Sequence, residues 1–564
     1  MRAALALLAL CAYSLAAPSA VPLSLGVHHL VDASLLASSS GTYVAAGVPV
    51  KDPTPLLTPE HPWEAAMHFY TSAVSLPAAG GPQYLLYYAC SDAVLFFHPI
   101  SLCVANSSDG VTWQKPLLDI HPYTANGTRP PEPTNIVFIT ESTTCGLQAI
   151  VDPRPGGAAG VSLYYESTAK RFVFAASAPD GFSFTPSAAG NATDSTPALP
   201  YSGLADTMLS ATYSAASDAY RIFGRADMGY ANSTFGCPGA NAVFRVVVVT
   251  QKACAGAHPC SPIEPSGWTE PEAILAPGTG GDELDCLDNY DAAALAIPDA
   301  GTGTLYVMMP SSFRHMALAD SGAPDTRAGA NDGVMDIRLA VSRSGTNFSF
   351  PSRDAFISRG IGARDPASGL YNASGSERDA GFVFATAGGV IDADPASPTI
   401  SVLFWGSQTT HAGGGAYLYR YSGAFTGIFR ARLRREGWAA LATLPSDPVG
   451  AGAAETVPLL LPVPAPGSAL FLRLNADISV AGTLNVSFVD AATRTPLPGF
   501  RPGDCVALHG NAVRQLVTCV GAGAGGDLAA LAARALPVVI RRALVHTKLY
   551  AWEFALTGGL NERE

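Results

Sequence analysis

The run QYLLYYACSD at residues 83–92, followed by SLCVANSSDGVTW at residues 101–113, holds the pattern that decides the fold. An aromatic and β-branched stretch leads to a second such stretch, which ends in a Ser-x-Asp-Gly turn before an aromatic residue. Short apolar runs closed by turn residues are typical of β-strands. Together the two runs predict a unit of two joined strands.

The same unit recurs four more times along the chain. The later copies are VSLYYES with RFVFAASAPDGFSF (161–184), DAYRIFGRAD with AVFRVVVVTQK (218–252), TLYVMMPSSFRH with MDIRLAVSRSGTNFSF (304–350), and ISVLFWGSQTTH with AYLYRYSGAFTGIFRARL (400–433). Multi-stranded repeats of about 60–85 residues are typical of β-propellers, so the five copies predict an all-β protein with a five-bladed β-propeller. A β-sandwich is the alternative, but it leaves the repeated strand–turn–aromatic pattern unexplained.

The 564 residues of the chain exceed what one core usually supports, which is about 250–300 residues. Residues 1–20, MRAALALLALCAYSLAAPSA, combine one Arg, an apolar run and small residues, as a secretory signal peptide does. We assign residues 21–446 to the propeller. Near residue 440 the repeat pattern stops and Pro and Gly cluster, so residues 447–557 are expected to form a C-terminal β-sandwich.

Two further features predict a secreted or secretory-pathway location. Seven Asn-x-Ser/Thr acceptor sites for N-glycosylation are present, at Asn106, Asn126, Asn191, Asn232, Asn347, Asn372 and Asn485. The chain has ten cysteines, and an oxidising compartment would pair most of those left after signal removal. The spacing favours three near pairs, Cys90–Cys103, Cys254–Cys260 and Cys505–Cys519.

The charge and hydropathy of the chain restrict its partners. The formal charge of −12 argues against nucleic acid and anionic membranes, which have no basic patch to meet here. No stretch after the first 20 residues reaches about 18 uninterrupted apolar positions, so membrane insertion is not expected. A neutral or cationic partner fits this composition better.

An acidic stretch stands out in a chain of which only 14% is charged: DELDCLDNYDAAALAIPDAGTGTLYVMMPSSFRH, residues 282–315. Carboxylates this crowded repel one another unless a cation, a proton or a polyhydroxyl ligand lies among them. Calcium is a possible occupant of the acidic cluster or of a central channel, and no other cofactor is indicated. The alternative is a solvated acidic loop. We expect a loop that brings Asp288, Tyr290 and Arg314 to the centre of the propeller.

Several segments resemble secreted glycoside hydrolases of families 32 and 43, and more closely the uncharacterised bacterial proteins called "family 32-like". They are WEAAMHFYTSA from Trp63, YLLYYACSD, LCVANSSDGVTWQKP, DNYDAAALAIPDAGTGTLYVMMPSSFRH, NDGVMDIRLAVSRSGTNF and LFLRLNADISVAGTLNVSFVDAATRTPLPGF. The resemblance covers most of the chain, and it implies a five-bladed propeller followed by a β-sandwich, acting on an oligo- or polysaccharide.

The catalytic motifs of family 32 are altered here. Its Asn-Asp-Pro-Asn-Gly motif is matched only at Asp52-Pro53. Its Glu-Cys-Pro-Asp motif is echoed by Asp285-Cys286-Leu287-Asp288, with Asp in the position of the acid, and Arg364-Asp365-Pro366 lies after this cluster instead of before it. The resemblance therefore implies the scaffold more strongly than the fructosidase reaction.

Glycoside hydrolysis needs one protonated carboxyl as acid and one ionised carboxylate as base or nucleophile. We predict Glu64 or Asp206 as the base or nucleophile and Asp288 or Glu283 as the acid. The predicted substrate-binding residues are Trp63, Tyr290, Arg314, Asp332, Asp336 and His411, and no metal ligand is assigned. Carboxylates, aromatic rings and an Arg from several blades can converge on one funnel.

Each residue also has a structural interpretation. Glu64 could be a surface residue at a strand start, and Asp206 a turn residue. Arg314 could form a structural salt bridge, His411 could belong to a loop, and Asp332 could belong to a hairpin turn. At the level of function, the alternatives to a hydrolase are a non-catalytic glycan-binding or cell-surface protein, and a propeller-borne lyase or phosphorylase.

Overall fold

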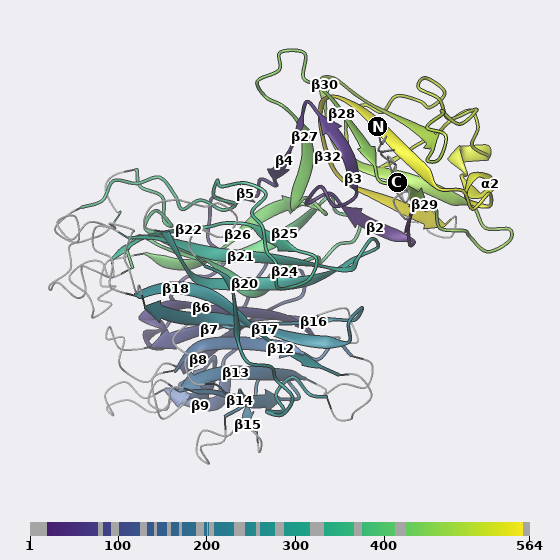
Figure 1. The fold of residues 1–564 in the computed structure, drawn as a ribbon. Helices are drawn as coiled ribbons and strands as arrows, with labels where there is room; N and C mark the ends of the chain where they lie inside the picture. Colours follow the sequence, from purple (N-terminus) through teal and green to yellow (C-terminus); the bar gives the residue numbers. More distant parts are fainter. Residues whose placement is uncertain are drawn as a thin grey trace, which may run out of the picture. The chain divides into compact units, whose positions relative to one another are not determined.

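The computed structural model describes residues 20–76, 83–91, 101–123, 132–139, 144–154, 160–167, 172–187, 197–199, 201, 208–229, 243–254, 260–276, 287–315, 332–365, 371, 375–411 and 425–556. Within these ranges the chain is almost entirely β-structure, as the sequence predicts (Figure 1). None of the helices found there has the length and apolar composition needed to cross a bilayer.

The chain divides into two compact units. The first, here called the ring unit, spans Val44–Ala440, and the second, the terminal unit, combines Met1–Tyr43 with Leu441–Glu564. The sequence analysis had assigned residues 21–43 to the first domain. These residues instead form strands of the terminal unit, because β-pairing can join segments that lie far apart in the sequence.

In the ring unit, antiparallel pairing gives five groups of strands, and parallel bridges join three of these groups into one twelve-stranded sheet. The first is β6 (Ala66–Leu76), β7 (Gln83–Ser91), β8 (Ser101–Ser107) and β11 (Ile136–Ile139). The second is β12 (Thr144–Val151), β13 (Val161–Ser167), β14 (Phe172–Ala178) and β15 (Thr185–Pro186). The third is β16 (Ser210–Ser214), β17 (Ala219–Gly229), β18 (Val243–Ala253) and β19 (Glu272–Leu275).

The fourth and fifth groups have a modified outer part. The fourth is β20 (Leu287–Asp299), β21 (Gly303–His315), and then β22 (Gly333–Ile337) and β23 (Ala340–Ser342), which both pair with β21. The fifth is β24 (Phe382–Ile391), β25 (Thr399–Ser407), β26 (Thr426–Arg434) and β5 (Val50–Lys51). Its last strand thus comes from the beginning of the unit. A separate pair joins β9 (Leu118–Tyr123) and β10 (Glu132–Thr134), and a short 3-10 helix, η1 (Pro62–Glu64), precedes β6.

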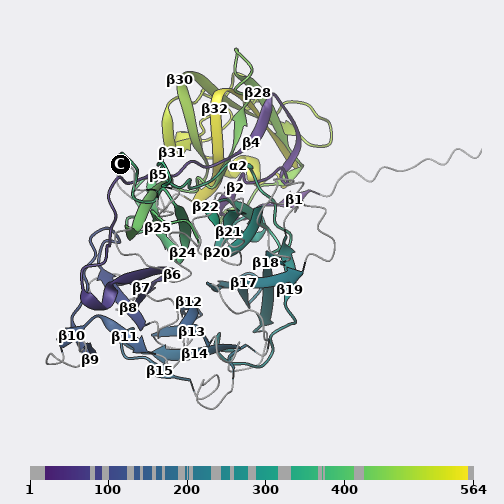
Figure 2. The same cartoon turned by 90° about the vertical axis from the view of Figure 1, so that its left-hand side faces the viewer.

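The first strands of the five groups contact one another in the closed order β6, β12, β16, β20, β24 and back to β6, around a common centre (Figure 2). Buried hydroxyls link them. Thr71 of β6 is hydrogen-bonded to Thr386 of β24 at 2.9 Å, and the Ser72 hydroxyl accepts a hydrogen bond from the backbone of β12 at 3.0 Å. Ser210 of β16 accepts one from the backbone of β20 at 2.7 Å.

The repeated runs seen in the sequence are the second and third strands of each group. Their turns share a geometry as well. Gly110, Gly181 and Gly345 all have positive φ, at 68°, 77° and 79°, which favours glycine. In the first two turns, the side chains of Asp109 and Asp180 accept hydrogen bonds from the backbone two and three residues later. The three predicted disulfides, Cys90–Cys103, Cys254–Cys260 and Cys505–Cys519, are confirmed.

The terminal unit is built on one ten-stranded sheet that extends into the boundary strands β4 and β27. Its strands are β1 (Val21–Pro22), β2 (Gly26–His29), β3 (Leu36–Ser40), β4 (Thr42–Ala46), β27 (Ala439–Thr443), β28 (Ala451–Thr456), β29 (Leu459–Leu460), β30 (Leu470–Asp490), β31 (Asn511–Leu516) and β32 (Val538–Leu556). Two short helical turns, η5 (Ala524–Gly526) and α2 (Ala529–Ala532), lie before β32.

Strand β32 is the centre of the terminal unit because it pairs with β2, β27, β28, β29 and β30. Its register against β30 shifts between its two halves, next to His546, whose φ is 43°. Arg542 and Trp552, ten residues apart on β32, lie in contact, so the strand bends back on itself. The apolar core of this unit includes Leu472, Phe488 and Ile540.

Candidate functional site

The first strand of the fourth group carries a β-bulge in the middle of the acidic stretch. The register of β20 against β21 shifts between Asn289 and Ala292, so that Tyr290 and Asp291 both lie opposite Ser311. An extra residue in one strand redirects the side chains beside it, and such bulges are frequent next to functional sites. The sequence analysis expected a loop over this part, whereas the structure has a strand from Leu287 onward.

The bulge places several polar side chains on one face of the hairpin. Asp288 lies opposite Phe313, and Ser311 and His315 lie two residues to either side of Phe313, hence on its face. Asp291 interacts with the side chain of Ser311, so it shares that face as well. In a regular strand, residues 288 and 291 would point to opposite faces because their separation is odd.

Asp288 is a buried, ionised carboxylate. Only 1% of the residue is exposed, and its Oδ2 atom accepts hydrogen bonds from Arg245 Nη1 at 2.9 Å and from His315 Nε2 at 3.0 Å. Burial opposes ionisation, but Arg245 and His315 together hold the pKa of Asp288 below its usual value. Its other oxygen, Oδ1, has no hydrogen-bond partner among the described residues.

Asp291 has the opposite character. It is also 1% exposed, and apart from its interaction with the Ser311 side chain neither carboxyl oxygen has a hydrogen-bond partner within the described ranges. Burial raises the pKa of Asp291 to about 7, against the opposing effects of Ser311 and Arg225. Two carboxyls of one strand thus favour different protonation states, Asp288 charged and Asp291 neutral below about pH 7.

Tyr290, between the two carboxyls, is the centre of an aromatic and cationic cluster. The guanidinium carbons of Arg225 and Arg245 lie 4.8 and 4.7 Å from the centroid of its ring. Edge-on contacts follow with Phe313 at 5.8 Å and with His411 at 4.8 Å between ring centroids. The Tyr290 side chain is itself buried, so its ring packs inside the cluster.

Three other predicted substrate-binding residues, His411, Asp332 and Asp336, lie on β22 or contact its first residue. His411 is buried and its backbone N–H donates to Gly333 O at 2.9 Å, so it is a member of the cluster. Asp332, fully buried, accepts from the Gly333 backbone at 2.8 Å and lies 3.5 Å from Arg364 Nη2. Asp336 is half-buried and accepts from a backbone N–H of the next segment.

Arg314 does not join the group. It precedes His315 on β21 and is exposed, so strand alternation directs it away from Asp288. Three residues that were not predicted do join the cluster, Arg225, Arg245 and His315. A charged residue inside an apolar run such as VFRVVVV at 243–249 signals a buried partner, because a lone Arg is rarely buried in a strand. That signal was available for Arg245.

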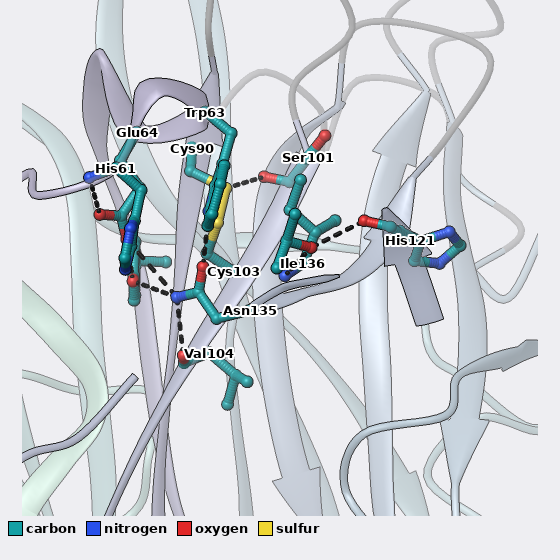
Figure 3. Close-up of a disulfide and its surroundings, with 12 residues drawn as sticks. His61, Trp63, Glu64, Cys90, Ser101, Cys103, Val104, His121, Asn135 and Ile136 are labelled. Atoms are coloured by element: carbon teal, nitrogen blue, oxygen red, sulfur yellow. Dashed lines mark hydrogen bonds between the residues drawn. A yellow bond between two sulfur atoms is a disulfide. The ribbon is translucent and has the colours of Figure 1, made fainter. Parts of the chain in front are cut away.

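Glu64 and Trp63 lie in a separate network near the Cys90–Cys103 disulfide (Figure 3). Glu64 is fully buried, and its Oε2 atom accepts from Lys115 Nζ at 2.8 Å and from the backbone of Glu60 and His61 at 3.0 and 3.2 Å. Tyr88 donates to its Oε1 atom at 2.5 Å.

The partners of Glu64 fix its charge state. Burial raises the pKa of Glu64. Lys115 and the hydrogen bond from Tyr88 lower this pKa by a larger amount, so the net shift is downward. Trp63 is buried, donates from Nε1 to Asn135 Oδ1 at 2.8 Å and stacks on His61 at 4.5 Å. These partners are distinct from those of Asp288, which come from β18 and β21.

Asp206 and Glu283 lie outside the described residues, as do the neighbouring carboxylates Asp282 and Asp285. Across the ranges that are described, no group of three or more His, Cys, Asp or Glu side chains is arranged to hold a metal ion. Most of the acidic cluster in which calcium was considered therefore lies outside the described structure.

No protein-family model and no curated protein matches the chain. Similar solved structures include an N-acetylgalactosamine deacetylase from F. plautii in complex with blood group B trisaccharide, with a TM-score of 0.41 and 14% identity over 71% of this chain and 97% of that one. A thermostable family-43 glycoside hydrolase has a TM-score of 0.35 and 12% identity, over 74% and 98%. An exo-inulinase from Aspergillus awamori has a TM-score of 0.35 and 12% identity, over 89% and 99%. Similarity at this level says nothing about the reaction, so the chemistry has to be read from this chain's own side chains.

Proposed function

We propose that the chain is a secreted glycoside hydrolase that acts on an oligo- or polysaccharide with the carboxyl pair Asp288 and Asp291. The observation that carries this proposal is the opposite protonation preference of two buried carboxyls on one face of β20. Environments that push apart the pKa values of two neighbouring carboxyls are how glycosidases hold one acid protonated and the other ionised at the same pH.

In this proposal Asp291 is the general acid. It is neutral below about pH 7 and would protonate the oxygen of the leaving sugar. Asp288, which Arg245 and His315 keep ionised, supplies the negatively charged carboxylate that the reaction needs beside the acid. The unpartnered oxygens of both carboxyls are where substrate or water would bind, since buried polar atoms normally have partners.

The scaffold in this proposal is a five-bladed β-propeller with a β-sandwich. Five antiparallel groups whose first strands follow one another in a closed cycle support five blades. Strand β5, from the start of the unit, pairs with β26 of the fifth group. This pairing of the first and last parts of the unit supports a closed ring. The bend in β32, which lets one strand contribute to two facing layers, supports the sandwich.

Secretion and N-glycosylation form part of the same proposal. Three disulfides favour an oxidising compartment. Asn347, one of the predicted acceptor sites, is exposed in the Gly345 turn. The signal peptide at residues 1–20 would direct the chain there.

Asp288→Asn and Asp291→Asn test the function on a broad glycan panel, with release of reducing sugar as the measurement. Each substitution should lower kcat by about 10²–10⁴-fold, the usual contribution of acid–base catalysis. Asp152→Asn is the matched control. Asp152 is also a buried aspartate paired with an arginine, but its partners are Arg154 and Tyr220 of β17. Wild-type turnover should decline above about pH 7, as Asp291 loses its proton.

Full activity in both variants would refute this assignment of the carboxyl pair. If the wild type cleaves no glycan of the panel but binds one, measured by calorimetry, the chain is a glycan-binding protein instead.

A further inference from the structure

His315 is a titratable residue of the cluster that the carboxyl pair alone leaves without a function. Its Nε2 atom lies 3.0 Å from Asp288 Oδ2, and its side chain is 4% exposed. Its second ring nitrogen, Nδ1, has no hydrogen-bond partner among the described residues. A buried imidazole with one nitrogen fixed and the other without a partner is arranged to exchange a proton there.

The contacts of His315 determine which nitrogen carries the proton. Asp288 is ionised and can only accept, so Nε2 of the neutral ring is protonated and donates to it. Nδ1 then has a bare lone pair. The ring of Phe313 packs against the imidazole at 4.2 Å between centroids, which restricts its rotation. A carboxylate that fixes the tautomer and the orientation of an imidazole is the arrangement that makes histidine a base in other hydrolases.

Charged groups surround the imidazole from several strands. Arg245 of β18 shares the Oδ2 atom of Asp288 with it, at 2.9 Å. Arg225 of β17 acts on Asp291 of β20 and lies 4.8 Å from the Tyr290 ring centroid, and His411 contacts the same Phe313 ring at 5.0 Å. Asp288 is the carboxylate in direct contact, so it is the group that would stabilise a positive charge on His315.

We propose that His315, oriented by Asp288, is the general base of the reaction. This inference rests on the proposed hydrolase function. Nδ1 takes a proton from the attacking water while the water oxygen forms its bond to the anomeric carbon. The bond from that carbon to the leaving oxygen breaks with its electron pair, and the leaving oxygen takes the proton of Asp291. His315 then returns its proton to solvent, and Asp291 is reprotonated.

His315→Gln tests the base directly, because the glutamine Nε2 amide can still donate to Asp288 but cannot accept a proton at pH 5–8. Variants and wild type are compared on the glycan that the wild type cleaves. The expected result is a kcat lower by about 10²–10⁴-fold, an unchanged KM and loss of the acidic limb of the pH–rate profile. Activity of His315→Gln within about threefold of wild type, with that limb retained, would overturn the proposal.

Failure of the inference can be separated from failure of the proposed function. If Asp288→Asn and Asp291→Asn are inactive but His315→Gln is active, the carboxyl pair stands and Asp288 itself is the base. If all three variants are fully active, both the carboxyl pair and the base are assigned to the wrong residues.

A second measurement needs no substrate. In nitrogen-15 spectra of histidine-labelled protein, the signals absent from His315→Gln identify His315. They should show a protonated Nε2 and a bare Nδ1 at neutral pH, and Asp288→Asn should shift the ring toward the other tautomer. A protonated Nδ1 in the neutral wild-type ring would contradict the proposal.

Discussion

The guanidinium carbon of Arg542 lies 4.1 Å from the centroid of the Trp552 ring, within one bent strand and inside an apolar core. Arg542 is 1% exposed, and its Nε, Nη1 and Nη2 atoms have no hydrogen-bond partner in the described part of the chain. Burial lowers the pKa of Arg542 to about 9, so the side chain is still charged at neutral pH. The ring face offsets only part of the cost of removing this charge from water.

Replacing this arginine should therefore not destabilise the terminal unit. We expect Arg542→Met to leave the free energy of unfolding unchanged or to raise it by about 1–4 kcal/mol, because the apolar stem is kept and an unpaired charge is removed. Urea unfolding followed by tryptophan fluorescence measures this. Arg541→Met is the control, since the neighbouring Arg541 is half-buried and paired with Glu455, and it should change stability by less than about 1 kcal/mol. A loss of more than 2 kcal/mol in Arg542→Met would show that an acceptor satisfies the guanidinium in solution.

The Glu64–Lys115 pair should behave as a buried structural ion pair. Their side chains are 0% and 4% exposed. Lys115→Met should cost about 3–5 kcal/mol, because it leaves the Glu64 carboxylate buried without its cation. Glu64→Gln should cost less, because Lys115 keeps Glu60 at 3.4 Å. The double variant should recover part of this loss, which a double-mutant cycle by urea unfolding detects. Additive losses would argue against the pairing, and loss of turnover at unchanged stability would favour Glu64 as the base predicted from the sequence.

Asp288 and Asp291 should give stability profiles of opposite sign with pH. An unfolded Asp titrates near pH 3.9, while folded Asp291 titrates at about 7, so the folded state holds the extra proton between these values. The contribution of Asp291 to stability therefore falls as the pH rises from about 4 to about 7. Asp291→Asn should become more stable than wild type above pH 7 and equal to it below pH 4.

The folded pKa of Asp288 is lowered, so its contribution is present above the unfolded pKa and is lost as the pH falls. Asp288→Asn should thus be destabilised at pH 7, and the difference from wild type should shrink in acid. Chemical unfolding of both variants from about pH 2 to pH 8 measures the two slopes. Slopes of the same sign would contradict the assigned charge states.

The turn glycines offer a test of the repeated geometry. A Cβ atom at Gly345, where φ is 79°, would lie 2.8 Å from Arg221 Nε, whereas at Gly375, where φ is 85°, nothing lies within 4 Å. Gly375→Ala should cost about 1–2 kcal/mol from backbone strain alone. Gly345→Ala should cost more, because Arg221 must also shift away from Tyr306. Equal losses in thermal unfolding would show that the contact with Arg221 is unimportant.

The sequence contained enough information for the strands that repeat. The run VSLYYES at 161–167 coincides with β13, because apolar alternation and a glycine turn are local signals. The start of β20 was not recognised, because its carboxylates resemble a solvated loop unless their buried partner is known. That partner, Arg245, lies 43 residues away in the sequence. The strands of residues 21–43 were misplaced for the same reason, since their partners in β28, β29 and β32 are remote.

The candidate site was predictable in composition but not in register. Asp288, Tyr290 and His411 were expected to converge, and the structure brings them into one cluster. Arg314 was chosen over His315, because nothing in the sequence tells which of two adjacent residues faces the partner strand. Asp291 was not among the predicted site residues, yet it is buried on the same face as Asp288, because the bulge in β20 adds a residue that no pattern reveals.

Strand β32 imposes an order of events on the terminal unit. Five strands depend on it for pairing, yet it follows all five of them in the chain. About 500 residues separate β2 from β32, so at about 5–20 residues per second β2 is made roughly half a minute to two minutes before its partner. Through that interval its backbone donors and acceptors lack the strand they pair with, as an open sheet edge does. The terminal unit can therefore complete its sheet only after β32 has been made, whereas the described strands of the ring unit are all made before it.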